Sequence, residues 1–210
     1  MWTYNYSTYS DELYHYGVLG MKWGQHKAAR RYAKQLNRLD RKASNVVGDT
    51  IFYDYKANKY ANKAAAYVKK KGNNPTEKQL AKLDKLRKKA IGNKKLSDAA
   101  RKVYEQYDAE TWKTIADAAA KGYSVNNKSI TRTTRRGAGI RSSITIPAFA
   151  ITGGGVIPGV ITGAIAAGVI LGKEKKYAGK YTTKDPKTGV EVDQSPYRVL
   201  GNKYKVKANK

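Results

Sequence analysis

The chain has 210 residues, with 42 Lys and Arg against 16 Asp and Glu, and a formal net charge of +26. Such a charge opposes compaction by self-repulsion and favours polyanionic partners such as nucleic acid, anionic membrane or acidic protein surfaces. The absence of cysteine excludes disulfides and thiolate metal sites, and the two histidines, His15 and His26, do not have a metal-ligand spacing.

The first 24 residues form a tyrosine-rich segment in which Lys22 is the only basic residue. Alone, such a segment buries too little apolar surface to offset the entropy lost on ordering. It also lacks the basic and apolar regions of a secretory signal peptide. We interpret residues 1–24 as an aromatic docking arm that becomes ordered on a partner.

Residues 25–122 have helical periodicity and are predicted to form a basic helical bundle. In the first part, small, aliphatic and tyrosine side chains recur at alternating spacings of three and four, which is a heptad pattern. This seam consists of Ala29, Tyr32, Leu36, Leu39, Ala43, Val46, Thr50, Tyr53, Ala57, Tyr60, Ala64 and Tyr67. Because Gly48 and Thr50 weaken its middle, one continuous helix over 25–71 and two helices with Asp49 as the second N-cap both fit the pattern.

The sequence KKGNNPTEKQL predicts the end of this helix and the start of another. Gly72 suits a C-terminal cap, Asn74 an N-cap and Pro75 the first helical position. The Gly-Asn dipeptide at 92–93 predicts a further break, after which a third helix ends at Gly122. Short connections favour antiparallel neighbours. The predicted fold class is therefore mainly α: a small helical bundle of one long helix, or a helix pair, and two shorter helices.

Residues 123–143 are rich in basic and hydroxyl side chains and are predicted to be a basic linker. The segment that follows, 144–172, has no charged side chain in 29 positions. A helix needs roughly 20 apolar residues to span a bilayer, so this segment is long enough to do so. Small residues recur in it at every fourth position, a glycine-zipper ridge that lets helix backbones approach closely. The ridge consists of Gly155, Gly159, Gly163 and Ala167.

Three interpretations of residues 144–172 stay open: a transmembrane helix, a re-entrant or helical hairpin bent near 153–155 and Pro158, and a segment buried within a protein assembly. Basic residues flank both ends, so the positive-inside rule gives no orientation. These cations are the candidate contacts to lipid headgroups or other phosphates: Arg132, Arg135, Arg136, Arg141, Lys173, Lys175 and Lys176.

Residues 173–210 form a basic tail in which two stretches alternate around turn residues. The sequences YTTKDPKTGVEVD and YRVLGNKYKVK are each predicted to form a short β-hairpin. Either hairpin is only marginally stable unless it packs on another element.

The sequence ELYHYGVLGMKWG, residues 12–24, resembles a motif found near the ends of structural and head-associated proteins of tailed bacteriophages. The family form is Tyr-His-His-Gly-Ile/Leu-Leu-Gly-Met-Lys-Trp-Gly, usually followed by Val-Arg-Arg, and this chain departs from it at Tyr16 and over 25–27. The matching residues are Tyr14, His15, Gly17, Leu19, Gly20, Met21, Lys22, Trp23 and Gly24. The resemblance implies a phage origin and association with the virion, without identifying the virion part.

The same motif has the chemistry of a docking segment. Tyr14, Tyr16, Met21 and Trp23 are large side chains of the kind that dominate binding hot spots. The glycines between them permit tight turns that would gather these anchors into one pocket. The alternative is that the segment folds back and caps the end of the helical bundle.

No motif in the sequence indicates catalysis. There is no Walker loop, no cysteine-based site, no His-Glu metal spacing and no nucleophile elbow. We therefore expect neither an enzyme nor a cofactor.

The expected function is that of a virion-associated structural protein, packaged inside the head or attached to it through capsid or portal proteins. Its basic helices would bind DNA through phosphates without sequence readout. Its glycine-zipper segment would engage an anionic host membrane during genome delivery. Two alternatives stay open: a membrane-resident phage protein, such as a pore or lysis accessory, and a structural capsid adaptor. The helical seam also allows a homo-oligomer.

Overall fold

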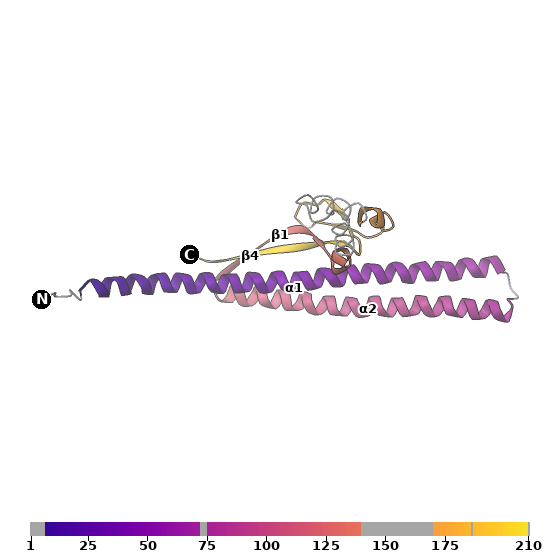
Figure 1. Cartoon of the computed structure of the whole chain (residues 1–210), viewed down its shortest axis with the longest axis horizontal. Coiled ribbons are helices and arrows are strands. Elements are labelled where there is room, and N and C mark those ends of the chain that lie inside the picture. Colours follow the sequence, from indigo (N-terminus) through magenta and orange to yellow (C-terminus); the bar gives the residue numbers. More distant parts are fainter. Residues whose placement is uncertain (1–6, 72–74, 140–169, 186, 210) are drawn as a thin grey trace, which may run out of the picture.

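The computed structural model describes residues 7–71, 75–139, 170–185 and 187–209, with side chains from residue 24 onward. Two long helices dominate the fold (Figure 1). The elements in chain order are α1 (Ser7–Lys71), α2 (Glu77–Ala120), β1 (Tyr123–Thr133), β2 (Thr182–Lys184), β3 (Glu191–Asp193) and β4 (Arg198–Ala208). The fold is therefore mainly α, with α1 and α2 forming an antiparallel hairpin and two small antiparallel sheets beside it.

The predicted heptad seam of α1 is the side that packs on α2. Each of its positions from Ala29 to Tyr67 is buried or half-buried, and Leu36 is fully buried. α1 runs without interruption through 65 residues, or about 98 Å at 1.5 Å per residue. Of the two alternatives that the sequence allows, the single continuous helix is the one observed.

Gly48 has a packing role in α1 and does not break the helix. A Cβ at this position would lie 2.8 Å from the carbonyl oxygen of Pro196 and 2.8 Å from the Thr134 side chain. Another segment of the chain therefore approaches α1 closely at this point, and a larger residue would push it away.

The predicted break at 92–93 is wrong, because α2 is a single helix of 44 residues. Its inward positions also follow a heptad spacing, and the sequence pattern hides it because several of them are polar. Ser97, Thr111 and Thr114 are buried. The hydroxyls of both threonines donate to carbonyl oxygens four residues earlier, at 2.7 and 2.8 Å. The helix itself thus satisfies these hydroxyls, and a polar seam can stay buried.

The N-terminus of α2 differs slightly from the prediction, whereas its C-terminus agrees with it. Thr76, and not Asn74, is the N-cap, and its backbone N–H donates to the Gln79 side chain at 3.1 Å. Pro75 lies before this cap. At the other end Gly122 has φ +79°, a left-handed conformation that ends helices and favours glycine.

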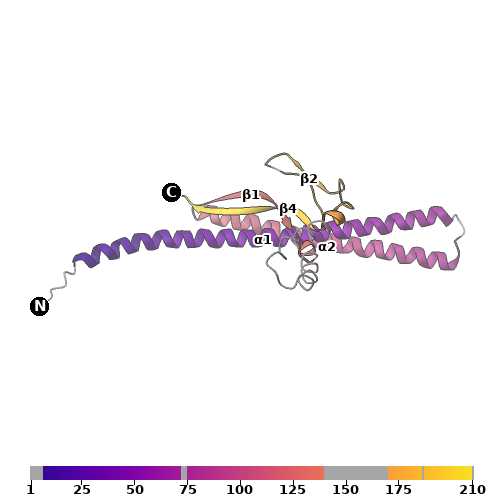
Figure 2. The same cartoon turned by 45° about the horizontal axis from the view of Figure 1, so that its top comes forward.

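The predicted basic linker over 123–143 is wrong in its first half, because residues 123–133 form β1. This strand pairs antiparallel with β4 along its full length, from Tyr123 opposite Ala208 to Thr133 opposite Arg198. The predicted hairpin within YRVLGNKYKVK is therefore also wrong, since these residues lie in one continuous strand. The predicted hairpin in YTTKDPKTGVEVD is confirmed as β2 and β3, with Thr182 opposite Asp193. Figure 2 shows β1 and β4 side by side along α1.

The predicted boundary between an arm and a helical region near residue 24 is absent from the backbone. α1 begins at Ser7 and continues as helix through Gly17, Gly20 and Gly24, so the prediction that these glycines make tight turns is wrong. α1 is 65 residues long and α2 is 44, and Figure 1 shows the amino-terminal part of α1 extending past the end of α2.

Within the described ranges, no helix is both long enough and apolar enough to cross a membrane. The uncharged segment 144–172, apart from its last three residues, lies outside those ranges.

Candidate nucleic-acid interface

A row of basic residues runs along the amino-terminal half of α1. Its members are spaced by four, three, four and three residues, so they lie on one face of the helix. All five are exposed, and among the described residues none of them takes part in an ion pair. We call this row the basic stripe: Lys27, Arg31, Lys34, Arg38 and Arg41.

The three acidic residues of α1 with described side chains form no ion pair with the stripe, because each of them holds another element. Asp40 binds Arg132 of β1, Asp49 binds Arg136 at 2.7 Å, and Asp54 binds Arg101 of α2 at 2.5 Å. The exposed fractions of the three carboxylate side chains are 9%, 21% and 15%. These contacts turn every carboxylate of α1 between residues 24 and 71 away from the stripe.

Asp40 is the most buried of the three and organises the contact between α1 and the β1–β4 ribbon. Its carboxylate accepts hydrogen bonds from the Arg132 guanidinium and, at 2.8 Å, from the backbone N–H of Asn202. Asn37, one turn earlier, accepts from the N–H of Tyr204 at 3.1 Å and donates to its carbonyl at 2.9 Å. Burial raises the pKa of Asp40, and its hydrogen bonds and the Arg132 charge only partly oppose this. The ribbon is thus fixed on α1 beside the stripe.

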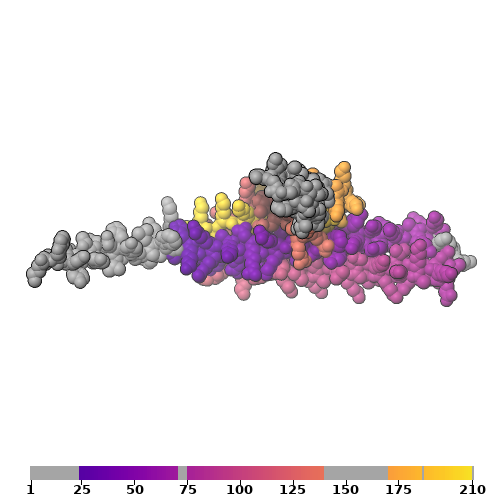
Figure 3. All heavy atoms as spheres, viewed as in Figure 1, coloured from indigo at the N-terminus to yellow at the C-terminus, as the bar shows by residue number. Residues whose placement is uncertain are grey.

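A groove forms where β4 meets the stripe. Its walls carry four exposed cations and no acidic residue, and its only other charge, Arg132, is already paired with Asp40. The lining residues are Lys34, Asn37, Arg38, Arg41, Ile130, Arg132 and Lys203. Figure 3 shows the side chains of β4 standing along this face of α1. The groove is open to an elongated anionic ligand.

The β1–β4 ribbon adds further cations to this surface. Lys203, Lys205 and Lys207 are exposed and alternate along β4, so they project from one side of the strand. Lys128 of β1 is exposed directly opposite Lys203. Like charges opposite each other destabilise a strand pair. An anion placed between them would relieve this repulsion, which is a feature expected of a surface that binds phosphates.

The residues predicted from the sequence to contact phosphates differ in exposure, in pairing and in their distance along the chain from the stripe. Arg132 and Arg136 are engaged with Asp40 and Asp49 and have side chains only 14% and 27% exposed. Arg135 is 80% exposed and also lies 3.6 Å from Asp49. Lys173, Lys175 and Lys176 are also exposed but lie in the carboxy-terminal part of the chain, away from the stripe in sequence and outside the groove. Arg141 lies outside the described residues.

The other predicted site residues belong to the docking motif and to the glycine zipper. The docking motif Tyr14, His15, Gly17, Leu19, Gly20, Met21, Lys22, Trp23 and Gly24 lies in the helical backbone of α1. The glycine-zipper positions Gly155, Gly159, Gly163 and Ala167 lie outside the described residues. In the part of the chain that the structure describes, no group of three His, Cys, Asp or Glu side chains could hold a metal ion.

Sequence reasoning did not single out the basic stripe, although its signal is present. Basic residues recur at 27, 31, 34, 38 and 41, and Asp40 is the only acidic residue in this stretch. What the sequence does not reveal is that Asp40 faces Arg132, more than ninety residues away, and therefore does not pair with the stripe.

A family of unknown function (DUF7211) matches residues 7–30, which is the amino-terminal part of α1. No curated protein and no solved structure matches the chain. The match covers the end of α1 that extends past α2, together with the beginning of the basic stripe.

Proposed function

We propose that this protein is a non-catalytic structural component of a phage virion, inside the head or attached to it, that binds nucleic acid through phosphates without reading sequence. The observation that carries the nucleic-acid part is the basic stripe, with five exposed cations on one face of α1 and no ion pair to neutralise them within the described residues. Phosphate neutralisation by Lys and Arg supplies most of the affinity in sequence-independent binding.

The dimensions of the stripe support binding to an extended polyanion. From Lys27 to Arg41 the helix rises about 21 Å at 1.5 Å per residue. Duplex DNA carries one phosphate charge per about 1.7 Å of its axis, so this length faces about 12 charges. The groove beside β4 adds Lys203 to the same surface. A single small anion would engage only part of such an array.

The amino-terminal end of α1 is proposed as the element that attaches the protein to capsid or portal proteins. It carries the motif that resembles head-associated phage proteins, and α1 exceeds α2 by 21 residues. Helices that do not pack on another element are marginally stable in water. A partner that covers the aromatic side chains of this motif would therefore stabilise the helix as well as bind it.

The glycine-zipper helix or hairpin over 144–172 is proposed to engage an anionic host membrane during genome delivery. Its support is the sequence: 29 positions without a charged side chain, between basic flanks. A membrane-resident pore or lysis accessory and a structural adaptor with this segment buried between subunits are the alternatives that the experiments below distinguish.

The nucleic-acid proposal predicts a change in salt dependence. The full-length variant Arg31→Gln/Lys34→Gln/Arg38→Gln/Arg41→Gln should bind duplex DNA at least about tenfold more weakly at low salt. The slope of log K against log salt should become shallower by about 3 to 4, because each lost phosphate contact removes about 0.9. Fluorescence anisotropy with labelled duplexes of two unrelated sequences measures both quantities, and the two duplexes should behave alike.

The matched control is Lys63→Gln/Lys69→Gln/Lys85→Gln/Lys95→Gln, which removes the same charge from exposed positions on different faces of α1 and α2. It should retain most of the affinity and the original slope. Equal losses in the two variants would mean that net charge alone drives binding, and the stripe would have no special role.

The virion proposal predicts that mass spectrometry of purified phage particles detects this chain. Its presence in host membranes but not in particles would favour the membrane-resident alternative. Deletion of residues 144–172 should leave particles that assemble but infect poorly, whereas failed assembly would favour the adaptor.

A further inference from the structure

Two short helices, residues 135–139 and 170–174, are held by the same four-residue segment, 195–198. On the first side, the backbone N–H of Thr134 donates to the carbonyl of Tyr197 at 2.9 Å, and the Thr134 hydroxyl donates to the carbonyl of Pro196. Gly137 lies so close that a Cβ there would be 2.5 Å from the Tyr197 carbonyl oxygen. The helix at 135–139 therefore cannot move without displacing this segment.

On the second side, Glu174 fixes the other short helix to the same segment. Its carboxylate accepts two hydrogen bonds from the Arg198 guanidinium, at 2.8 and 2.5 Å, and one from the Ser195 hydroxyl at 3.0 Å. Burial raises the pKa of Glu174, but the hydrogen bonds from Arg198 and Ser195 outweigh it and lower the pKa below its ordinary value. The carboxylate is thus held ionised against the segment.

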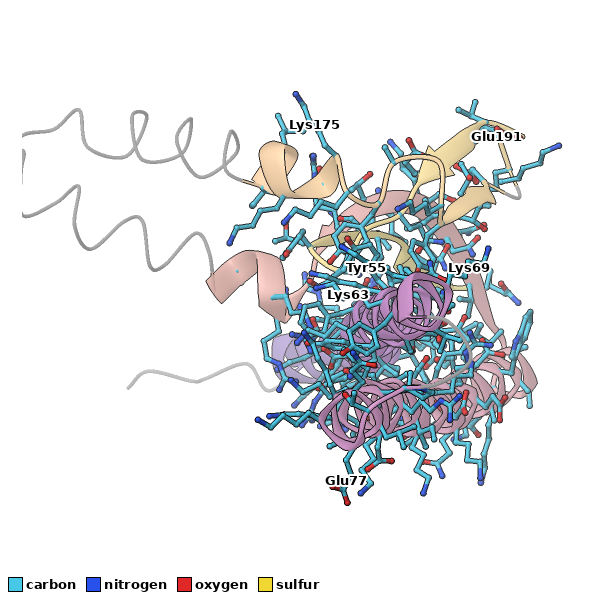
Figure 4. All side chains as sticks on the ribbon, turned by 90° about the vertical axis from the view of Figure 1, so that its right-hand side faces the viewer. Tyr55, Lys63, Lys69, Glu77, Lys175 and Glu191 are labelled. Carbon is cyan, nitrogen blue, oxygen red and sulfur yellow. The ribbon has the colours of Figure 1, made fainter. Side chains whose placement is uncertain are left out.

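We call segment 195–198 and the two helical segments that it holds, 135–139 and 170–174, the clasp. Aromatic packing and an ion pair connect the clasp to α1. Tyr177 is buried, with its ring centroid 4.9 Å from that of Tyr55 in α1 and 6.1 Å from that of Tyr197. The Arg136 guanidinium lies 3.9 Å from the centroid of the Phe52 ring and binds Asp49. Both short helices are therefore attached to one stretch of α1, and Figure 4 shows them on the same side of the hairpin.

The clasp fixes the positions of residues 139 and 170 relative to each other. Residue 139 lies in the first helical segment, and residue 170 lies in the second. Each is within five residues of a direct contact to 195–198. A helix that crosses a bilayer once has its ends about 30 Å apart on opposite sides of the hydrocarbon core. Two ends held on one four-residue segment cannot satisfy that requirement.

The exposed charged residues near 139 and 170 are all basic, and one large apolar side chain is exposed among them. Arg135 is 80% exposed, and Lys173, Lys175 and Lys176 are exposed and in no ion pair within the described ranges. Leu171 is 52% exposed beside them. The two acidic residues here are already paired: Asp49 binds Arg136 at 2.7 Å and lies 3.6 Å from Arg135, and Glu174 binds Arg198. Figure 4 shows Lys175 pointing away from the helical hairpin.

We propose that this face of the molecule, formed by Arg135, Leu171, Lys173, Lys175 and Lys176, lies on an anionic lipid surface, with residues 139 and 170 on the same side of the bilayer. The inference rests on the membrane engagement in the proposed function and specifies its geometry. Cations at a lipid surface attract anionic headgroups, and an exposed leucine among them suits the interfacial layer. The surface is separate from the basic stripe, so lipid and nucleic acid bind to different parts of the molecule.

The charge requirement is tested with the full-length variant Lys173→Gln/Lys175→Gln/Lys176→Gln in flotation with phosphatidylglycerol–phosphatidylcholine vesicles. Its partition coefficient should fall by about one to two orders of magnitude, since each basic residue near an anionic surface contributes roughly fivefold. The control Lys63→Gln/Lys69→Gln/Lys85→Gln loses the same charge and should partition like the wild type. Equal loss in both variants, or equal binding to pure phosphatidylcholine, would overturn the proposal.

The sidedness is tested with single cysteines, which is straightforward because the chain has none. For Gly139→Cys and Gly172→Cys, no described atom outside the neighbouring backbone lies within 4 Å of the new Cβ. After vesicles with bound protein are washed in high salt, a membrane-impermeant maleimide is added outside. Both cysteines should react as completely as they do in detergent.

Protection of one cysteine with reaction of the other would show a single crossing and overturn the proposal. Release of the protein by the salt wash would show adsorption by charge alone and would also overturn it. Duplex DNA binding by the same protein samples separates these outcomes from failure of the nucleic-acid proposal, because the stripe is intact in every variant used here.

Discussion

α1 and α2 are paired along most of their length but use their acidic residues in opposite ways. Between residues 24 and 71, α1 has thirteen Lys or Arg against three Asp, and all three bind other elements. α2 has eleven Lys or Arg against seven Asp or Glu. Asp84 and Asp98 pair with lysines of α2 itself, and Asp117 with Lys121 just beyond its end, each four residues away.

The difference explains why the candidate interface lies on α1. Carboxylates that pair along the helix surface neutralise neighbouring cations in place and contribute little to stability. Carboxylates that turn inward hold the ribbon, the clasp and α2 in position, and form no ion pair with the cations of the basic stripe. The same three residues therefore stabilise the fold and expose the stripe.

The largest expected effect is on stability, from removing an inward carboxylate. Asp40→Ala leaves the Arg132 guanidinium, whose side chain is 14% exposed, without its partner. Breaking a largely buried ion pair in this way should lower the free energy of unfolding by about 3 to 5 kcal/mol. Urea denaturation followed by circular dichroism measures the change. Asp84→Ala, which removes an exposed pair of α2, should cost less than about 0.5 kcal/mol. Similar costs for both would contradict the contrast between the helices.

Glycine-to-alanine substitutions test the same contrast between α1 and α2 at the backbone. Gly48→Ala in α1 should destabilise the protein by about 1 to 3 kcal/mol, because the new methyl group would press on the Pro196 carbonyl and Thr134. Gly92→Ala in α2 meets nothing within 4 Å and should stabilise by about 0.5 to 1 kcal/mol through helix propensity. Thermal unfolding should shift in opposite directions, and a shift of the same sign in both would disprove the close approach at Gly48.

The smallest expected effect depends on pH. Burial raises the pKa of Asp54, but hydrogen bonds from Ser97 and Arg101 outweigh this, so its pKa lies below the ordinary value of 3.8. A carboxyl of this kind stabilises the fold above pH 3.8, and the contribution is lost as pH falls through the lower folded pKa. Asp54→Asn should therefore cost about 1 kcal/mol near neutral pH and nothing in strong acid. A mutational cost that stays constant from neutral pH to strong acid would rule out this role.

Sequence reasoning succeeded where the pattern is local and apolar. The α1 seam is visible because alanine, leucine and tyrosine recur with heptad spacing, and the turn before α2 is visible because Gly72 and Pro75 interrupt it. The β2–β3 hairpin was predicted for the same reason, since turn residues separate two adjacent short strands.

Prediction from the sequence failed where a polar residue occupies a buried position, or where the paired element is distant in the sequence. Ser97 and Thr114 hide the second seam, because polar side chains at buried positions interrupt the apolar pattern that marks a seam. The β1–β4 ribbon joins residues at least 65 positions apart, so no local signal specifies it. The Gly201–Asn202 pair resembles a turn, yet Gly201 is there because the Arg132 and Ser44 side chains approach it closely.

The overhang of α1 has a mechanical consequence. Because one unbroken helix carries both the amino-terminal motif and the stripe, the two are coupled in distance and in rotation. Each residue inserted between them would move the motif by about 1.5 Å and turn it by about 100° relative to the stripe. A partner protein bound to the motif would therefore set the angle at which the stripe meets the proposed polyanion.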